Sequence, residues 1–487
     1  MGNITDTARS ETRDFAAHPF DDVDALVLSQ LMYERMPSCV PTLADAERQY
    51  GSFVARLRSC SPRHPLRSLK TLWRRPFPSV PIRTIDHNLG PSDFRLDTNY
   101  AGLGDPECTA EFFRVLAVNP RYAPLGFGAY EELHDEARQM QFAAMTVDLG
   151  RIPRVTATEP PSTTKQQPAA TNRTADQDSA KQTTTNQPTT AKQPDTGPSN
   201  TPPAPTLAVV FRGTDTSLVG WKEDLNMACQ YPIPAQEAAA RYLARVADLW
   251  PGRLLVMGHS KGGNLAVYAA MAVPETVRER IDVVYSLDGP GFLPGMMGSH
   301  APEYHAVKAK VRKIVPESSS VGMIFEQLDD DSLAEYAAFV PVRSDGTGVM
   351  QHFAFTWQIG RQIGRPSDSK TAATETTTPE ISETTETVDG GFSPAPDGLS
   401  PIARRFNKSL NDWVLSMPVE QRRRVIDSVY DVLRASGVTS IVDLPKSLPG
   451  SIPAMLGAVR SLSADDLAQA GSALRLLAAA TLNNLGR

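Results

Sequence analysis

The 487-residue sequence has few cysteines, no long hydrophobic run and little net charge. Its four cysteines, Cys39, Cys60, Cys108 and Cys229, form no CxxC pair, which argues against a disulfide framework and against a zinc site. Scattered cysteines fit a reducing compartment, so we expect a cytoplasmic protein. No segment is long and apolar enough to cross a bilayer, and the polar N-terminal stretch lacks the apolar core of a secretory signal.

The charge balance narrows the range of partners. The sequence has 55 acidic and 49 basic residues, a formal net charge of −6. This imbalance is mild for the length, so nucleic acid and anionic membranes are not expected partners. We expect neither a cofactor nor a metal.

Two polar segments, 157–205 and 366–397, carry too few large apolar side chains to offset the entropy of ordering, so we expect both to be disordered. Apolar runs at 142–149 and 207–211 flank the first segment and are typical of strands. We interpret them as a hairpin whose tip is expanded by an insert, because loop closure becomes only slightly more costly with length. A true interdomain linker is the alternative.

Strands and helices alternate after residue 207. Apolar runs at 253–257, 282–287 and 311–315 are separated by helical patterns, which predicts an α/β fold with a mostly parallel sheet covered on both faces. From about residue 400, apolar residues recur every three or four positions, which predicts helices.

The expected organisation is therefore a flexible N-terminus (1–19), an α/β domain (20–365) containing the insert, a disordered linker (366–397) and a C-terminal helical region (398–487).

The pentapeptide Gly258-His259-Ser260-Lys261-Gly262 follows the apolar strand 253–257 and precedes a helical pattern. This strand–GxSxG–helix order is that of a nucleophile elbow, in which a sharp turn exposes the serine hydroxyl at a helix N-terminus. The positive end of the helix dipole favours the negative charge that develops there. We therefore expect Ser260 to be a nucleophile.

The segment Val209–Asp215 ends a strand with Arg-Gly-Thr-Asp. In the hydrolase fold an N–H from this loop joins the N–H that follows the nucleophile to form an oxyanion hole. These donors are predicted to be Thr214 and Lys261, with a further bond from the Thr214 hydroxyl. We expect Arg212 to form a structural pair with a carboxylate, with Asp224 as a candidate partner.

The acid and base should follow the serine in the order acid, then histidine. His352 lies on a late loop and is the preferred base, with His305 as the alternative. Asp288 ends an apolar strand and is the preferred acid. Glu317 and Glu326 remain alternatives for that role, as does a purely turn-capping function for Asp288.

These motifs resemble a bacterial family of lipase-like α/β-hydrolases, largely of unknown function and distantly related to class-three lipases. The most specific string is Gly258-His-Ser-Lys-Gly-Gly-Asn-Leu-Ala266; the others are Phe20–Gln30, Phe211–Asp215, Val219–Met227, Pro234–Gln236, Asp288–Phe292, Val321–Met323 and Met350–His352. The resemblance implies a serine-hydrolase fold with Ser260 as nucleophile. Class-three lipases carry leucine where this chain has Lys261.

The sequence thus predicts a serine esterase or lipase-like enzyme that acts through an acyl-enzyme on Ser260, with a small-molecule or lipid ester as substrate. The rival hypothesis is a catalytically silent hydrolase fold that serves as an interaction module.

Overall fold

The computed structural model describes residues 2–58, 77–90, 106–158, 203–360 without Pro294, and 391–440, together with short pieces between 443 and 471. Most of the predicted insert (157–205) and most of the predicted linker (366–397) lie outside the described residues. So do 441–442, 444–452 and 472–487 of the C-terminal region.

The described residues form one sheet of eight strands whose order in space is their order in the sequence. The strands are β1 (Val80–Pro81), β2 (Gly126–Asp135), β3 (Met140–Ile152), β4 (Ala204–Phe211), β5 (Arg253–His259), β6 (Ile281–Leu287), β7 (Val311–Pro316) and β8 (Ala338–Val342). The pairs from β1 to β4 are antiparallel, and those from β4 to β8 are parallel. The predicted α/β class with a mostly parallel sheet is confirmed.

The two strands that flank the polar insert are direct neighbours. β3 and β4 pair antiparallel from Ala144 opposite Phe211 to Ile152 opposite Ala204, as the hairpin interpretation predicts. The sequence analysis did not predict β2, because Gly126–Asp135 contains glycines and charged residues and has no regular apolar alternation.

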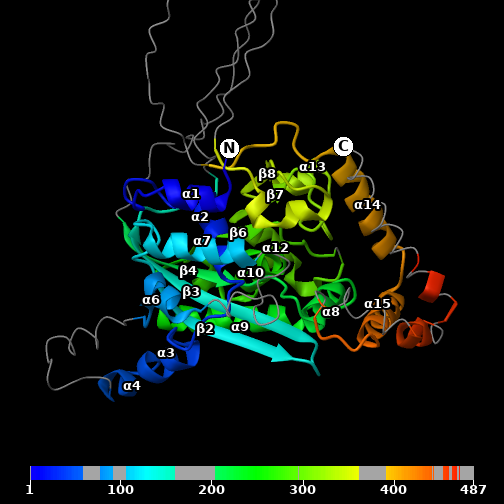
Figure 1. Ribbon diagram of the computed structural model, residues 1–487, viewed down its shortest axis with the longest axis horizontal. Coiled ribbons are helices and arrows are strands. Elements are labelled where there is room, and N and C mark those ends of the chain that lie inside the picture. Colours follow the sequence, from blue (N-terminus) through cyan, green and yellow to red (C-terminus); the bar gives the residue numbers. More distant parts are fainter. Residues whose placement is uncertain are drawn as a thin grey trace, which may run out of the picture.

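Helices cover both faces of the sheet (Figure 1). One face carries α1 (Ile4–Ser10), α2 (Asp22–Leu31), α6 (Ile82–Asn88) and α7 (Pro106–Val118); the other carries α3 (Leu43–Tyr50), α9 (Pro234–Leu249), α10 (Lys261–Ala272) and α12 (Ala301–Lys308). Strand residues alternate between the two cores, because successive side chains of a strand point to opposite faces. Leu255 and Met257 pack under α2, whereas Leu254 and Val256 pack under α10.

The stretch predicted to be a flexible N-terminus (1–19) contains α1. Asn3 caps this helix through the backbone N–H groups of Thr5 and Asp6, and Ile4 and Ala8 are fully buried. Gly2 pairs with Ile359 through two backbone hydrogen bonds. Only two apolar side chains anchor this short helix, which is too weak a pattern to recognise in the sequence.

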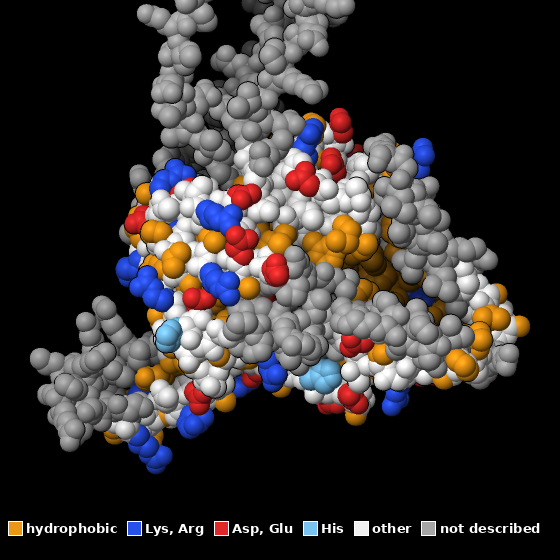
Figure 2. Space-filling model, in the orientation of Figure 1, with side chains coloured by type: hydrophobic (Ala, Val, Ile, Leu, Met, Phe, Trp, Pro, Cys, Tyr) orange, Lys and Arg blue, Asp and Glu red, His pale blue; other side chains and the backbone are white. Residues whose placement is uncertain are grey.

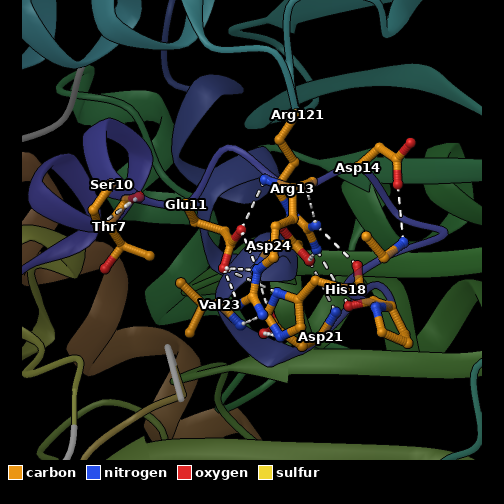
Figure 3. A network of polar contacts seen from close by, with 12 residues as sticks. Thr7, Ser10, Glu11, Arg13, Asp14, His18, Asp21, Val23, Asp24 and Arg121 are labelled. Carbon is orange, nitrogen blue, oxygen red and sulfur yellow. Dashed lines mark hydrogen bonds and ion pairs between the residues drawn. The ribbon is translucent and has the colours of Figure 1, made fainter. Parts of the chain in front are cut away.

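Three carboxylates hold the start of α2. Asp21 caps the helix by accepting from two backbone N–H groups, and Asp22 forms two 2.7 Å bonds with Arg312 on β7. Asp24 binds Arg121, which follows α7, at 2.7 Å and 2.5 Å (Figure 3). The acidic start of the Phe20–Gln30 motif therefore docks α2 onto the sheet and onto α7.

Two C-terminal helices, α14 (Pro401–Leu415) and α15 (Val419–Arg434), pack against the sheet domain (Figure 1). The buried side chain of Asn411 accepts from the Phe325 N–H and donates to the Met323 and Glu326 carbonyls. Lys222 on α8 (Leu218–Asn226) binds Asp427 on α15 at 2.5 Å. The C-terminal helices thus hold the loop after β7 as well as α8.

We expect Arg121→Met to lower the free energy of unfolding by about 3–5 kcal/mol, because it leaves the buried Asp24 carboxylate without its partner. Arg9→Met is the matched control: Arg9 is about half-exposed and pairs with Asp6 and Glu111 at the surface, where ion pairs contribute about 1 kcal/mol or less. Urea unfolding of both variants measures the difference. Equal losses would contradict this account of α2.

Candidate functional site

Ser260 lies on a strained turn between β5 and α10. Its φ is 58° and its ψ is −134°, a conformation that L residues rarely adopt and that is concentrated at functional sites. A Cβ at Gly258 would lie 2.3 Å from the backbone of Gly262, and one at Gly262 would lie 2.3 Å from the Phe211 carbonyl oxygen. Both glycines of the pentapeptide are therefore needed for the turn to close.

The structure brings His352 and Asp288 together. Nδ1 of His352 lies 2.6 Å from Oδ2 of Asp288; the carboxylate is fully buried and the imidazole is 17% exposed. Because an ionised carboxylate only accepts, Nδ1 carries the proton and Nε2 is left as the basic nitrogen. The ring of His352 lies 4.6 Å from that of His259, the residue before Ser260.

The loop after β7 fixes the second oxygen of Asp288. The Ser319 hydroxyl donates to Oδ1 at 2.5 Å, and the Gly322 N–H donates to it at 3.1 Å. Asn407 on α14 donates in turn to the Ser319 carbonyl at 2.8 Å. The sequence analysis missed these residues, although Gly322 lies within the Val321–Met323 motif.

The short 3-10 helix η3 (Gly348–His352) carries His352 and is anchored from both sides. The Ser318 N–H donates to the Gln351 side chain at 2.9 Å, and the indole N–H of the fully buried Trp357 donates to the Gln351 carbonyl at 2.9 Å. Nε2 of His259 lies 2.8 Å from the His352 carbonyl oxygen. These hydrogen bonds fix the position of the residue that carries the His352 imidazole.

Tyr33, just beyond the end of α2, reaches the nucleophile turn. Its hydroxyl lies 2.9 Å from Nδ1 of His259, the residue before Ser260. A Cβ at Gly213 would lie 2.1 Å from the Tyr33 oxygen, so Gly213 leaves room for this phenol. No sequence signal singles out Tyr33, which lies two residues after the end of α2.

The predicted oxyanion loop differs from expectation at two side chains. The Thr214 hydroxyl donates to Asp224 at 2.5 Å, so its proton is not directed at a substrate and only the backbone N–H remains as a candidate donor. Arg212 does form a carboxylate pair, but its partner is Glu132 at 2.8 Å rather than Asp224. Burial raises the pKa of Asp224 to about 6, against the opposing influence of Lys261.

The side chain of Lys261 is buried beneath the helix that follows Ser260. Its ammonium donates to Glu223 at 2.9 Å and to the side-chain and backbone oxygens of Gln141 at 2.7 and 3.1 Å. Burial lowers the pKa of Lys261, but the neighbouring carboxylates, Glu223 first and then Asp224, together outweigh it and the net shift is upward. Lys261 is therefore a charged partner for Glu223, and its ammonium is turned away from any substrate.

The alternative acids and bases lie elsewhere. His305 is exposed and binds Glu335 at 3.0 Å. Glu326 is buried and accepts from Lys313 and Tyr336, both at 2.7 Å. The structure describes no contact between the side chain of Glu317 and His305 or His352. Among the described residues, only Asp288 and His352 therefore form an acid–histidine pair beside Ser260.

Two further motifs hold the turn after Asp288. Asn264, one helical turn after Ser260, donates to the carbonyls of Pro290 and Gly291 at 3.1 and 3.0 Å. Gln236 at the start of α9 donates to Asn264 at 2.8 Å. The Pro234–Gln236 and Asp288–Phe292 motifs are thus linked to the nucleophile helix through a single asparagine.

Hydrophobic side chains line a hollow beside α14, below the segment that follows β8 (Figure 2). An apolar cluster joins the end of α8, the loops after β6 and β7, α14 and α15; its buried members are Ala228, Cys229, Leu293, Phe325, Val414 and Ile426.

The described residues contain no cluster of metal-ligating side chains, and none of the described helices is long and apolar enough to cross a membrane.

A protein-family model described as Mbeg1-like matches residues 199–391, and this family is related to lipase-like proteins. The matched region is less than half of the chain. It contains Ser260, Asp288 and His352, whereas Tyr33 and α14 lie outside it. No curated protein and no solved structure matches the chain.

We expect Lys261→Leu to destabilise the protein by about 3–5 kcal/mol, because it leaves the buried Glu223 carboxylate uncompensated. Adding Glu223→Gln should restore part of this loss, and a double-mutant cycle in urea measures the coupling. Lys408→Leu, at an exposed pair with Asp412, is the control. Additive effects of the two buried substitutions would contradict the pairing.

The buried His259 should make stability depend on pH. Burial, and then the neighbouring His352, lower its pKa to about 3, whereas in the unfolded chain it is near 6.5. Between these values the unfolded state binds one more proton, so stability falls with decreasing pH by up to about 1.4 kcal/mol per unit.

We therefore expect His259→Gln to flatten the acid side of the stability curve, measured by urea unfolding from pH 4 to 7. His305→Gln, at an exposed site, should leave the curve unchanged. Parallel curves for the wild type and His259→Gln would contradict a buried neutral imidazole.

Proposed function

We propose that this protein is a serine hydrolase that cleaves a carboxylic ester through an acyl-enzyme on Ser260. The observation that carries the proposal is a serine on a strained strand–helix turn beside a buried His352–Asp288 pair. The match to a family related to lipase-like proteins supports it. No other function has a specific observation in its favour.

In the proposed reaction, Ser260 Oγ attacks the ester carbonyl carbon while Nε2 of His352 takes the hydroxyl proton. The tetrahedral oxyanion accepts hydrogen bonds from the backbone N–H groups of Thr214 and Lys261. Collapse expels the alcohol, which takes the proton from His352. Water then attacks the acyl-enzyme and gives a proton to the same nitrogen. As the second tetrahedral intermediate collapses, His352 returns that proton to Ser260 Oγ, which releases the carboxylic acid and restores the free enzyme.

Asp288 stabilises the imidazolium that forms at each step. It binds Nδ1 of His352 at 2.6 Å and so favours the tautomer with a free Nε2. No hydrogen bond joins the side chains of Ser260 and His352 among the described contacts. The serine hydroxyl would therefore turn toward His352 when substrate binds, since catalytic hydrogen bonds are often long in unliganded enzymes.

We further assign the catalytic domain to residues 20–365 and a separate helical region to residues 398–487, of which α14 and α15 pack on that domain. The apolar hollow beside α14 is the proposed site for the non-reacting part of the ester, which makes a lipid or other apolar ester a suitable substrate. A cytoplasmic location is proposed from the cysteine pattern alone.

A fluorophosphonate probe tests the proposal directly, because it phosphonylates an activated serine. The wild type should be labelled and Ser260→Ala should not. His352→Ala should label at least about 100-fold more slowly, since general-base catalysis contributes factors of this size, whereas His305→Ala should label at the wild-type rate. Labelling no greater in the wild type than in Ser260→Ala would favour a silent interaction module instead.

A further inference from the structure

A chain of buried polar groups runs beside the proposed active site and uses neither of the side chains of the proposed acid–base pair. It starts at the Tyr33 hydroxyl, passes through both ring nitrogens of His259 and ends on the carbonyl oxygen of His352, with contacts of 2.9 and 2.8 Å. Tyr33 is 6% exposed and His259 is 4% exposed. Neither residue has a role in the reaction described above.

The proton positions along this chain follow from its last member. A backbone carbonyl oxygen can only accept, so Nε2 of His259 must carry a proton and donate it to His352. In the neutral imidazole Nδ1 is then the acceptor, and the Tyr33 hydroxyl must donate to it.

The position of the phenol is tightly defined. Gly213 lies against its oxygen, where any Cβ would come within 2.1 Å, and the ring of Tyr33 meets that of His259 edge-on with centroids 5.8 Å apart. The adjacent helix α2 is fixed at its start by the Asp22–Arg312 and Asp24–Arg121 pairs. Tyr33 is therefore presented to the nucleophile turn from a rigid element.

We propose that Tyr33 and His259 are positioning residues for the ester hydrolysis proposed above. Tyr33 sets the tautomer of His259, and His259 fixes the backbone of His352 so that its imidazole lies beside the serine. This inference rests on the proposed function, because it assigns the two residues to the same reaction.

The uncharged state of His259 is part of this arrangement. Its ring lies 4.6 Å from the His352 ring, which becomes positively charged in the transition state. A second imidazolium at that separation would oppose the charge, whereas a neutral ring with its N–H directed at the backbone does not. Tyr33, by donating to Nδ1, favours the neutral tautomer.

Tyr33→Phe removes only the hydroxyl. We expect kcat for a chromogenic short-chain ester to fall about 10- to 100-fold, a range typical of a misplaced catalytic group, with KM changed less than twofold. Tyr242→Phe is the matched control: Tyr242 is also fully buried and its hydroxyl also makes one hydrogen bond, to the Ala129 carbonyl at 2.7 Å. It should lose stability but keep kcat within twofold of the wild type.

Two replacements of His259 separate positioning from packing. His259→Gln keeps an N–H donor for the His352 carbonyl and should retain more activity than His259→Leu, which keeps bulk but donates nothing. In addition, ¹⁵N imidazole shifts should report a single Nε2–H tautomer for His259 in the wild type and a mixture in Tyr33→Phe. A merely structural role would not produce this change.

The outcomes can be told apart. If wild type is labelled by the fluorophosphonate but Tyr33→Phe keeps kcat within twofold, or if glutamine and leucine at position 259 are equally damaging, the inference is wrong and the proposed function stands. If wild type is labelled no more than Ser260→Ala, the proposed function fails and the inference fails with it. Loss of kcat in Tyr33→Phe, with Tyr242→Phe unaffected, supports both.

Discussion

The fully buried carboxylate of Asp288 is the constraint on which the proposed site depends. A buried charge is tolerated only when hydrogen bonds satisfy it. Asp288 has three such donors: His352 on η3, and the Ser319 hydroxyl and the Gly322 N–H in the loop after β7. Its own φ is 46°, so the turn after β6 is strained as well. The hydrogen bonds that satisfy this one carboxylate therefore bring β6, the loop after β7 and η3 to the same point.

The C-terminal helices contribute indirectly to the hydrogen bonding of Asp288. The loop that satisfies Asp288 includes Phe325, whose φ of 63° is unusual for a bulky residue. Asn411 accepts the N–H of this residue, and Asn407 holds the carbonyl of Ser319. Side chains of α14 thus stabilise a strained loop that itself positions the acid. We infer that α14 belongs to the catalytic unit, even though it lies outside the region matched by the family model.

The parts of the site that could be predicted from the sequence are local. The elbow around Ser260 is a contiguous strand–turn–helix pattern, and the β3–β4 hairpin is visible because its strands are apolar and its insert is polar. Asp288 could be ranked because parallel strands bring their carboxyl ends to one edge of a sheet, and His352 because this fold carries its histidine on a late loop. Both C-terminal helices follow from apolar spacing.

The parts that could not be predicted depend on long-range pairing. Arg212 binds Glu132 from β2, a strand without a clear apolar pattern, so no local signal could identify this partner. Tyr33 and His259 are far apart in the sequence and meet only because α2 packs under β5. The hydroxyl of Thr214 was expected at the oxyanion, but a neighbouring carboxylate, Asp224, accepts it instead.

Lys261 shows how an unusual residue beside the nucleophile can follow from packing. Glu223 accepts from the backbone N–H of Ala235 at the start of α9 and from that of Gln141 at the edge of β3, so it satisfies two buried donors at once. The same carboxylate would be costly to bury alone. Lysine supplies the opposite charge from the first turn of α10, where its backbone N–H remains free to face a substrate. A leucine at position 261 would leave the buried Glu223 carboxylate without its ion-pair partner, and the Lys261–Glu223 pair therefore has to be considered as a unit.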